Sequence, residues 1–125
     1  MSFRPIQSQQ RHGLKLLDQF YQFDDFMASI STMVDLGCGT GEDLLWWASA
    51  TTRDDAPQPL DIQCTGVDLF DSLPVIAKYP NASYQCRDFE TEISAPENGF
   101  DVLWCHDAFH LALDPIKTLS KWWHI

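Results

Sequence analysis

The chain has 125 residues, of which 45% are hydrophobic and 13% aromatic, enough for one globular domain with a substantial core. Eighteen acidic residues against eight lysines and arginines give a formal charge of −10, which argues against a nucleic-acid partner because phosphate binding needs clustered cations. No apolar run approaches the length of a membrane span, and the N-terminus lacks a secretory hydrophobic region. We therefore expect a cytoplasmic protein without a membrane partner.

The first third of the sequence predicts two helices around one strand. Apolar residues recur at helical spacing from His12 to Ile30, after a polar start. Residues 33–36 are short and apolar enough for a buried strand, and residues 42–50 have the apolar face of a helix.

The remaining sequence continues this alternation. Strands are expected at 62–67, 82–86 and 100–105, and helices at 71–79 and 114–123. The strand at 100–105 is almost continuously apolar, as expected for a parallel strand covered on both faces. The order predicts an α/β, Rossmann-like, doubly wound parallel sheet.

Cysteines and tryptophans are interpreted as core residues. The four cysteines form no C-x-x-C pair, so we expect small buried thiols of a reducing cytosol rather than disulfides or a zinc site. The paired tryptophans of the two helices are also expected in the core, as is usual on amphipathic helices. The residues concerned are Cys38, Cys64, Cys86, Cys105, Trp46, Trp47, Trp122 and Trp123.

Residues 34–43 read VDLGCGTGED, a strand, a glycine turn and a helix start. Glycine permits positive φ and brings the main chain close to a ligand without a Cβ in the way. Polar residues also follow the other strands: Asp68 the second, Asp88 the third, and His106 and Asp107 the fourth. In open parallel sheets these strand ends share one edge, where ligands bind. A carboxylate after the second strand can accept both hydroxyls of a ribose, and one after the third can accept from an adenine amino group.

The glycine spacing separates two cofactor classes. Dinucleotide-binding proteins use G-x-G-x-x-G, and Glu42 stands at the third glycine, followed by Asp43. Two carboxylates at a helix start would repel a pyrophosphate but would attract a cationic group. Their charge also interacts favourably with the positive end of the helix dipole, so they need not contact a ligand. The pattern therefore indicates S-adenosylmethionine rather than NAD.

The chain resembles the class I (Rossmann-like) S-adenosylmethionine-dependent methyltransferases from about residue 30 to its end. The similar segments are VDLGCGTGED, GVDLFDSL, CRDFE and, in the small-substrate branch, FDVLWCHDAFHLALDPIKTLSKWW. The resemblance implies that glycines pass under the methionine portion, that Asp35 helps to hold its amino group, and that Cys105 and His106 lie beside the sulfonium. It further implies that Asp68 binds the ribose, and that Asp88 and Phe89 bind the adenine. The complete implied cofactor set is Asp35, Gly37, Cys38, Gly39, Gly41, Asp68, Leu69, Asp88, Phe89, Cys105 and His106.

The chain departs from that family in length, because only four of seven strands are counted. We expect residues 1–125 to be the N-terminal part of a single methyltransferase domain. The fourth strand would then be an exposed sheet edge, which predicts self-association.

The chemistry leaves several alternatives. His106 or Asp107 could act as a catalytic base, or be an ordinary loop residue. His106 and His110 have a metal-binding spacing but no third ligand, so no metal is expected. CHDAF stands where amino-group and nucleobase methyltransferases often carry N-P-P-Y, which favours a small-molecule acceptor. A non-catalytic cofactor-binding or interaction module is the alternative function.

Overall fold

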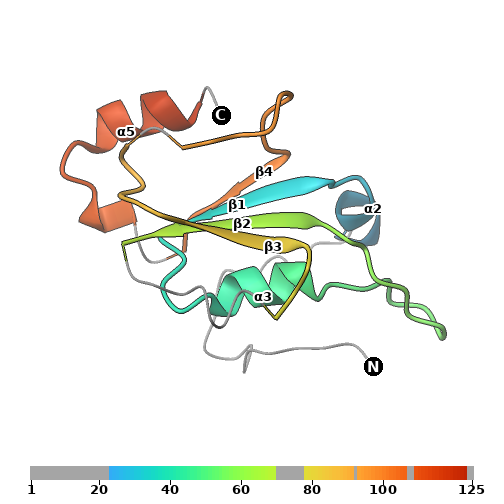
Figure 1. Ribbon diagram of the computed structural model, residues 1–125. Coiled ribbons are helices and arrows are strands. Elements are labelled where there is room, and N and C mark those ends of the chain that lie inside the picture. Colours follow the sequence, from blue (N-terminus) through green and yellow to red (C-terminus); the bar gives the residue numbers. More distant parts are fainter. Residues whose placement is uncertain (1–22, 70–77, 92, 107–108, 124–125) are drawn as a thin grey trace.

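The structure is a computed structural model that describes residues 23–69, 78–91, 93–106 and 109–123 (Figure 1). In chain order its elements are α2 (Phe23–Ala28), β1 (Thr32–Leu36), α3 (Glu42–Ala48), β2 (Gln63–Asp68), β3 (Ala82–Cys86), β4 (Val102–Trp104), the 3-10 helix η2 (Phe109–Leu111) and α5 (Pro115–Trp122).

The four strands form one parallel sheet in the order β3-β2-β1-β4. The chain passes from β1 through β2 to β3 in one direction and then returns to the other side of β1 to form β4. Strand order therefore reverses between β1 and β4, which is the switch point where open α/β sheets bind ligands. The predicted Rossmann-like α/β architecture is confirmed.

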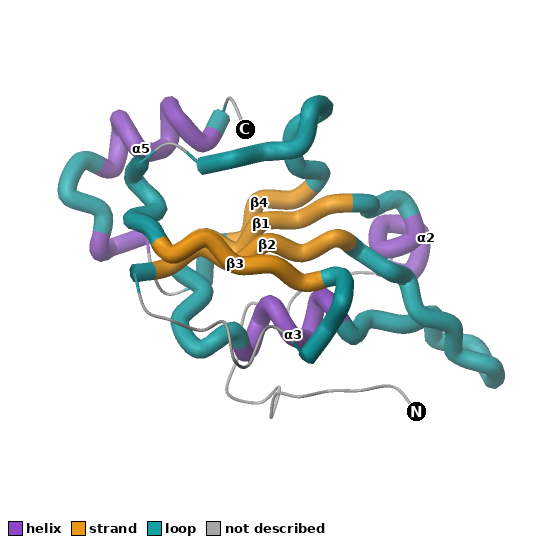
Figure 2. The backbone as a smooth tube through the Cα atoms, in the orientation of Figure 1, coloured by secondary structure: helices purple, strands orange, loops and turns teal. Residues whose placement is uncertain are grey.

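Helices lie on both faces of the sheet, with α3 on one side and α5 on the other (Figure 2). The central strand β1 serves both faces by alternation, because successive side chains of a strand point in opposite directions. Met33 packs with the tryptophans of α3, whereas Val34 and Leu36 pack in a second cluster with Trp122 of α5. All three β1 side chains are fully buried.

The predicted element boundaries hold well in the centre of the chain. β1, β2 and β3 differ by at most one residue at either end from the predicted strands. The last helix begins as its Asp-Pro start predicts, because the Asp114 side chain accepts a hydrogen bond from the Lys117 N–H at 3.1 Å. Of the helix predicted at 12–30, residues 23–30 lie in the described part, where the helix covers Phe23–Ala28 and ends two residues early, and most of the helix predicted at 71–79 lies outside it.

Three expectations about burial are wrong. β4 is shorter than predicted and is not covered on both faces: Leu103 is 39% exposed. The strand lies at the sheet edge, and Leu103 lines an open hollow together with Leu119, Trp122 and Trp123. Trp123 is 87% exposed while its neighbour Trp122 is buried, since adjacent residues on a helix face different directions. Cys86, at the end of the edge strand β3, is exposed rather than buried.

Candidate functional site

The glycine turn joins β1 to α3 and depends on left-handed backbone at three positions. Gly37, Gly39 and Gly41 have φ values of 78°, 57° and 90°, a region that costs other residues about 1–2 kcal/mol. The N–H groups of Gly37 and Cys38 donate to the Val67 carbonyl at 2.8 and 3.1 Å. These two N–H groups therefore hold the turn against β2 and do not serve a ligand. What the turn provides to a ligand is close approach to its backbone.

A fourth glycine, which sequence reasoning missed, brings β2 against the turn. A Cβ built on Gly66 would lie 2.9 Å from Cys38 Sγ and 2.9 Å from Leu44 Cδ2. Both distances are shorter than real Cβ contacts allow, so only glycine fits here without a shift. The available signal was a glycine inside a predicted strand, which often marks close backbone approach.

Asp68 ends β2 with its carboxylate against the glycine turn. Oδ2 accepts from the Gly39 N–H at 2.8 Å, and Oδ1 accepts from the Leu69 N–H at 2.6 Å. A carboxylate has about four acceptor positions, so these two bonds leave capacity for ligand hydroxyls. The Tyr84 hydroxyl donates to the Asp68 carbonyl at 2.9 Å. Burial, followed by nearby thiols and the Asp68 carboxylate, raises the pKa of Tyr84 to about 12, so this donor keeps its proton.

The segment after β3 forms a tight turn beside Asp68. Asp88 Oδ1 accepts from the Glu90 N–H at 2.9 Å, so its carboxylate also shapes its own loop. Phe89 is only 9% exposed, and its ring meets Trp122 edge-on at 5.6 Å. The Phe89 carbonyl accepts from Trp122 Nε1 at 3.0 Å. The main contacts of Phe89 are therefore with Trp122 of α5. Phe89 also lines the site.

Glu90 fastens α5 and the residues before it to the β3 segment. Its carboxylate accepts from the N–H of Leu113 at 2.8 Å, the N–H of Asp114 at 3.1 Å and Oγ1 of Thr118 at 2.7 Å. Its carbonyl accepts from Lys121 Nζ at 2.8 Å. The bonds from Leu113, Thr118 and Asp114, in that order, lower the pKa of Glu90 below its ordinary value.

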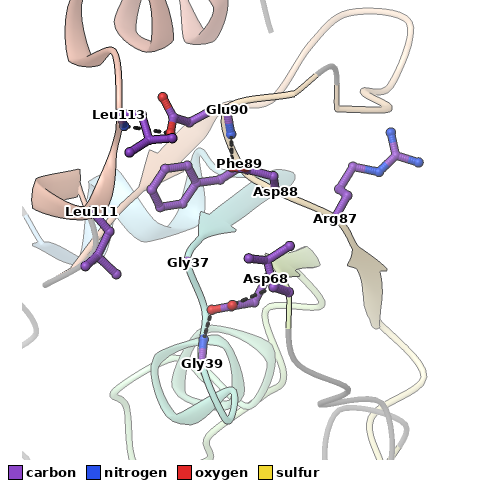
Figure 3. Close-up of a pocket in the computed structure, with 10 residues that line it drawn as sticks. Gly37, Gly39, Asp68, Arg87, Asp88, Phe89, Glu90, Leu111 and Leu113 are labelled. Atoms are coloured by element: carbon purple, nitrogen blue, oxygen red, sulfur yellow. Dashed lines mark hydrogen bonds between the residues drawn. The ribbon is translucent and has the colours of Figure 1, made fainter.

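These segments surround a cavity of about 460 Å³ at the carboxyl ends of β1, β2 and β3 (Figure 3). Its size lies within the range of small-molecule sites. The lining residues are Gly37, Gly39, Asp68, Leu69, Arg87, Asp88, Phe89, Glu90, Leu111 and Leu113.

Of the two apolar walls of the cavity, the one formed by Leu111 and Leu113 was not predicted, whereas Leu69 was. Leu111 and Leu113 come from η2 and the loop after it, and are 65% and 93% exposed. Leu69, at 67% exposed, comes from the loop after β2. Sequence could not place Leu111 and Leu113, because the Glu90 bonds that hold their segment join residues more than 20 positions apart.

The cavity brings together six of the eleven residues that the sequence assigned to the cofactor. They are Gly37, Gly39, Asp68, Leu69, Asp88 and Phe89. The other five, Asp35, Cys38, Gly41, Cys105 and His106, do not line it. Asp107, a candidate base, lies outside the described residues.

Asp35 is buried beneath the glycine turn, on the α3 side of the sheet. It is 2% exposed. Burial, and after it the negative charge of Asp35, raises the pKa of the Cys38 thiol and that of the Cys64 thiol. Both cysteines therefore remain uncharged, as expected for core residues rather than nucleophiles.

A second polar cluster links α3 to the end of β4. The Asp43 carboxylate oxygen Oδ2 accepts from Trp104 Nε1 at 2.9 Å and lies 2.9 Å from His106 Nδ1. Asp43 is 2% exposed. Sequence reasoning considered Asp43 only as a cofactor contact or a helix-dipole residue and missed this link across about 60 positions.

Among the described residues, no group of three histidines, cysteines, aspartates or glutamates is arranged to hold a metal ion. Within the same part of the chain, no helix has the length and apolarity needed to cross a membrane.

Two solved structures share this fold. The plantazolicin methyltransferase BamL, in complex with a triazolic desmethylPZN analog and SAH, is 22% identical with a TM-score of 0.62, and the match covers 94% of this chain and 44% of BamL. The plantazolicin methyltransferase BpumL, in complex with SAH, is 20% identical with a TM-score of 0.53, and the match covers 86% of this chain and 45% of BpumL. The chain thus spans less than half the length of these two proteins. No curated protein sequence matches it significantly.

The family assignment comes from a sequence profile. The profile described as a methyltransferase domain matches residues 34–125, from the start of the glycine motif to the last residue of the sequence. That match covers well over half of the chain and includes every strand of the sheet in whole or in part. The chain belongs to the methyltransferase domain family, which confirms the resemblance seen in its motifs.

Proposed function

We propose that this domain binds S-adenosylmethionine in the cavity at the strand ends and transfers its methyl group to a small-molecule acceptor. The observation that carries the proposal is the position of Asp68: its carboxylate lines the cavity and contacts the Gly39 N–H at 2.8 Å. A ribose bound by Asp68 would thus lie directly beside the glycine turn. Family membership and the presence of SAH in BamL and BpumL support the same ligand.

The charge of the cavity favours this cofactor over a dinucleotide. Three acidic residues line it, Asp68, Asp88 and Glu90, against one basic residue, Arg87. A pyrophosphate would meet repulsion there, whereas ribose hydroxyls, an adenine amino group and a cationic methionine end would find acceptors.

The glycine turn fits the thin middle of such a ligand. A Cβ built on Gly39 would meet no atom within 4 Å, so the backbone faces open space at this point. We propose that the methionine portion crosses here, with Gly37, Cys38 and Gly41 shaping the path. In this proposal Asp35 lies beneath the turn and helps to hold the amino group of the methionine portion, directly or through water.

The sulfonium itself supplies the electrophilic methyl group, so the protein has to orient the acceptor and exclude water. We propose that Cys105 and His106, which follow β4, lie on the acceptor side. The desmethylPZN analog in BamL supports a small-molecule acceptor here.

A labelled methyl group tests the acceptor class. The chain would be incubated with S-adenosylmethionine labelled in its methyl group and with a cell extract, and the extract would then be separated into small molecules, protein and nucleic acid. The proposal predicts label in the small-molecule fraction. Label confined to protein or nucleic acid would contradict it.

A second candidate function is cofactor binding without catalysis. It is favoured by one observation, that the chain matches only 44–45% of the length of BamL and BpumL. This candidate predicts binding of S-adenosylmethionine with no labelled product in any fraction of the same experiment.

A further inference from the structure

Burial of the Asp43 carboxylate costs free energy that a solvent-exposed acidic residue at a helix start does not lose. Asp43 and Glu42 both stand in the first turn of α3, where either charge favours the helix dipole. Glu42 is exposed, whereas Asp43 is 2% exposed. A buried carboxylate is unfavourable unless it is hydrogen-bonded. The dipole therefore does not explain why Asp43 is buried.

Asp43 uses one oxygen to bind two side chains at the end of β4. Oδ2 accepts from Trp104 Nε1 and from His106 Nδ1, each at 2.9 Å. The His106 ring also stands edge-on to the Trp104 ring, with centroids 6.1 Å apart and planes at 75°. Trp104 is fixed in turn against Trp47, at 5.6 Å. His106 is thus oriented by a hydrogen bond and by a ring contact.

The hydrogen bond selects the tautomer of His106. A carboxylate only accepts, so the ring nitrogen beside it, Nδ1, carries the hydrogen. In the neutral ring the lone pair is then on Nε2. A carboxylate that holds a histidine in this way is the recurring arrangement behind a general base.

We propose that Asp43 is a positioning residue that holds His106, through Nδ1, as the general base of methyl transfer. The proposal rests on the proposed function, because it needs S-adenosylmethionine as methyl donor and an acceptor bearing an O–H, N–H or acidic C–H group. His106 follows β4 at the carboxyl end of the sheet; it does not line the cavity, which lies at the carboxyl ends of the neighbouring strands β1, β2 and β3.

The proton balance is simple. The methyl carbon forms its new bond to the acceptor atom, while the S–C bond breaks with its electron pair remaining on sulfur. The acceptor's proton passes to Nε2 of His106. The resulting imidazolium lies beside the Asp43 carboxylate, which stabilises the positive charge and remains ionised.

Nitrogen NMR of the histidine rings tests the positioning without any ligand. The whole chain would be labelled with ¹⁵N-histidine, the four histidines separated with a His106→Gln variant, and spectra recorded where the imidazoles are neutral. The proposal predicts Nδ1–H as the main tautomer of His106. If Nε2–H is the main tautomer in the unmodified chain, the proposal is overturned, independently of the results for any variant.

Asp43→Ala then removes the acceptor that selects the tautomer. Without a carboxylate beside Nδ1, the Nδ1–H share of His106 should fall. Glu97→Ala, which removes one charge from an exposed loop, is the matched control and should leave the tautomer unchanged. An unchanged tautomer in a folded Asp43→Ala variant would also overturn the proposal.

Addition of S-adenosylmethionine tests the proposed function and the base role of His106 separately. Calorimetry that shows binding, together with shifted ring signals of His106, supports the base role. Binding without any change at His106 places the ring away from the reacting atoms and overturns the base role, while the proposed function stands. Absence of binding overturns the proposed function, and the base role with it, even if the tautomer is as predicted.

Discussion

Gly66→Ala is the perturbation that tests most sharply how the glycine turn is held. The turn docks on β2 through the Val67 carbonyl, and Gly66 makes room for it. Alanine would place its Cβ 2.9 Å from Cys38 Sγ and 2.9 Å from Leu44 Cδ2. Leu44 is fully buried and Cys38 is 8% exposed, so neither side chain can move aside without disturbing the core.

The expected cost follows from two opposing effects. Overpacking of this kind costs about 1–3 kcal/mol. Replacing glycine by alanine within an element recovers about 0.5–1 kcal/mol of backbone entropy and propensity. The net loss in free energy of unfolding should therefore lie between about 0 and 2.5 kcal/mol, with a middle value of about 1 kcal/mol. For a chain of this size that corresponds to a fall in Tm of roughly 4 °C per kcal/mol.

Thermal and urea unfolding of Gly66→Ala, Cys38→Ala and the double variant measure this as a cycle. Removing Cys38 Sγ relieves one of the two clashes, so the double variant should be more stable than the sum of the single effects predicts, by at least about 0.5 kcal/mol. Additive effects in this cycle would refute the close packing of β2 against the turn.

The other predictions concern the cavity and its surroundings. Asp68→Ala should weaken S-adenosylmethionine binding by about 1.5–3 kcal/mol, the range for hydrogen bonds to a charged group; unchanged affinity by calorimetry in a folded variant would place the ribose elsewhere. Gly39→Val should abolish binding, because a branched side chain would enter the open space beside the turn and strain a φ of 57°; full binding by this variant would contradict the ligand path. Because the pKa of Glu90 is lowered in the folded protein, its contribution to stability is present above its ordinary value of 4.5 and is lost as the pH falls through the folded value. Protection of the Leu113 amide against exchange, relative to its intrinsic rate at each pH, should therefore fall as the pH drops below 4.5 and through the folded pKa, and Glu90→Gln should remove this acid dependence; an identical pH profile in the variant would contradict the assignment. Trp123, the 87% exposed residue that follows α5 and lines a hollow with Leu103 of the edge strand β4, should promote self-association at micromolar concentration, measured by light scattering; a stable monomer that Trp123→Gln leaves unchanged would contradict it.

The fold was predictable because local patterns and long-range pairing agree. A short apolar strand, a glycine turn and an amphipathic helix specify a βα unit, and its repetition specifies a parallel sheet. β1 shows this agreement, since its alternating residues serve two cores. Prediction was poorest at β4 and Trp123, because exposure there depends on which elements cover a sheet edge.

The site was predictable where it follows the strand ends. Asp68 and Asp88 come directly after strands, so topology alone places them at one edge of the sheet. Leu111 and Leu113 were missed because Glu90 holds their segment in place through tertiary hydrogen bonds. The bond from Asp43 to His106 was missed for the same reason, since no sequence spacing connects a helix start to a strand end 63 residues later.

The central claim is that the cavity at the strand ends binds an adenosyl cofactor with a cationic methionine end. Isothermal titration of the chain with S-adenosylmethionine and, in parallel, with NAD tests it most directly. The account predicts saturable one-to-one binding of S-adenosylmethionine and much weaker or undetectable binding of NAD, because carboxylates surround the path that a pyrophosphate would need. Tighter binding of NAD, or no binding of S-adenosylmethionine by a folded chain, would contradict it.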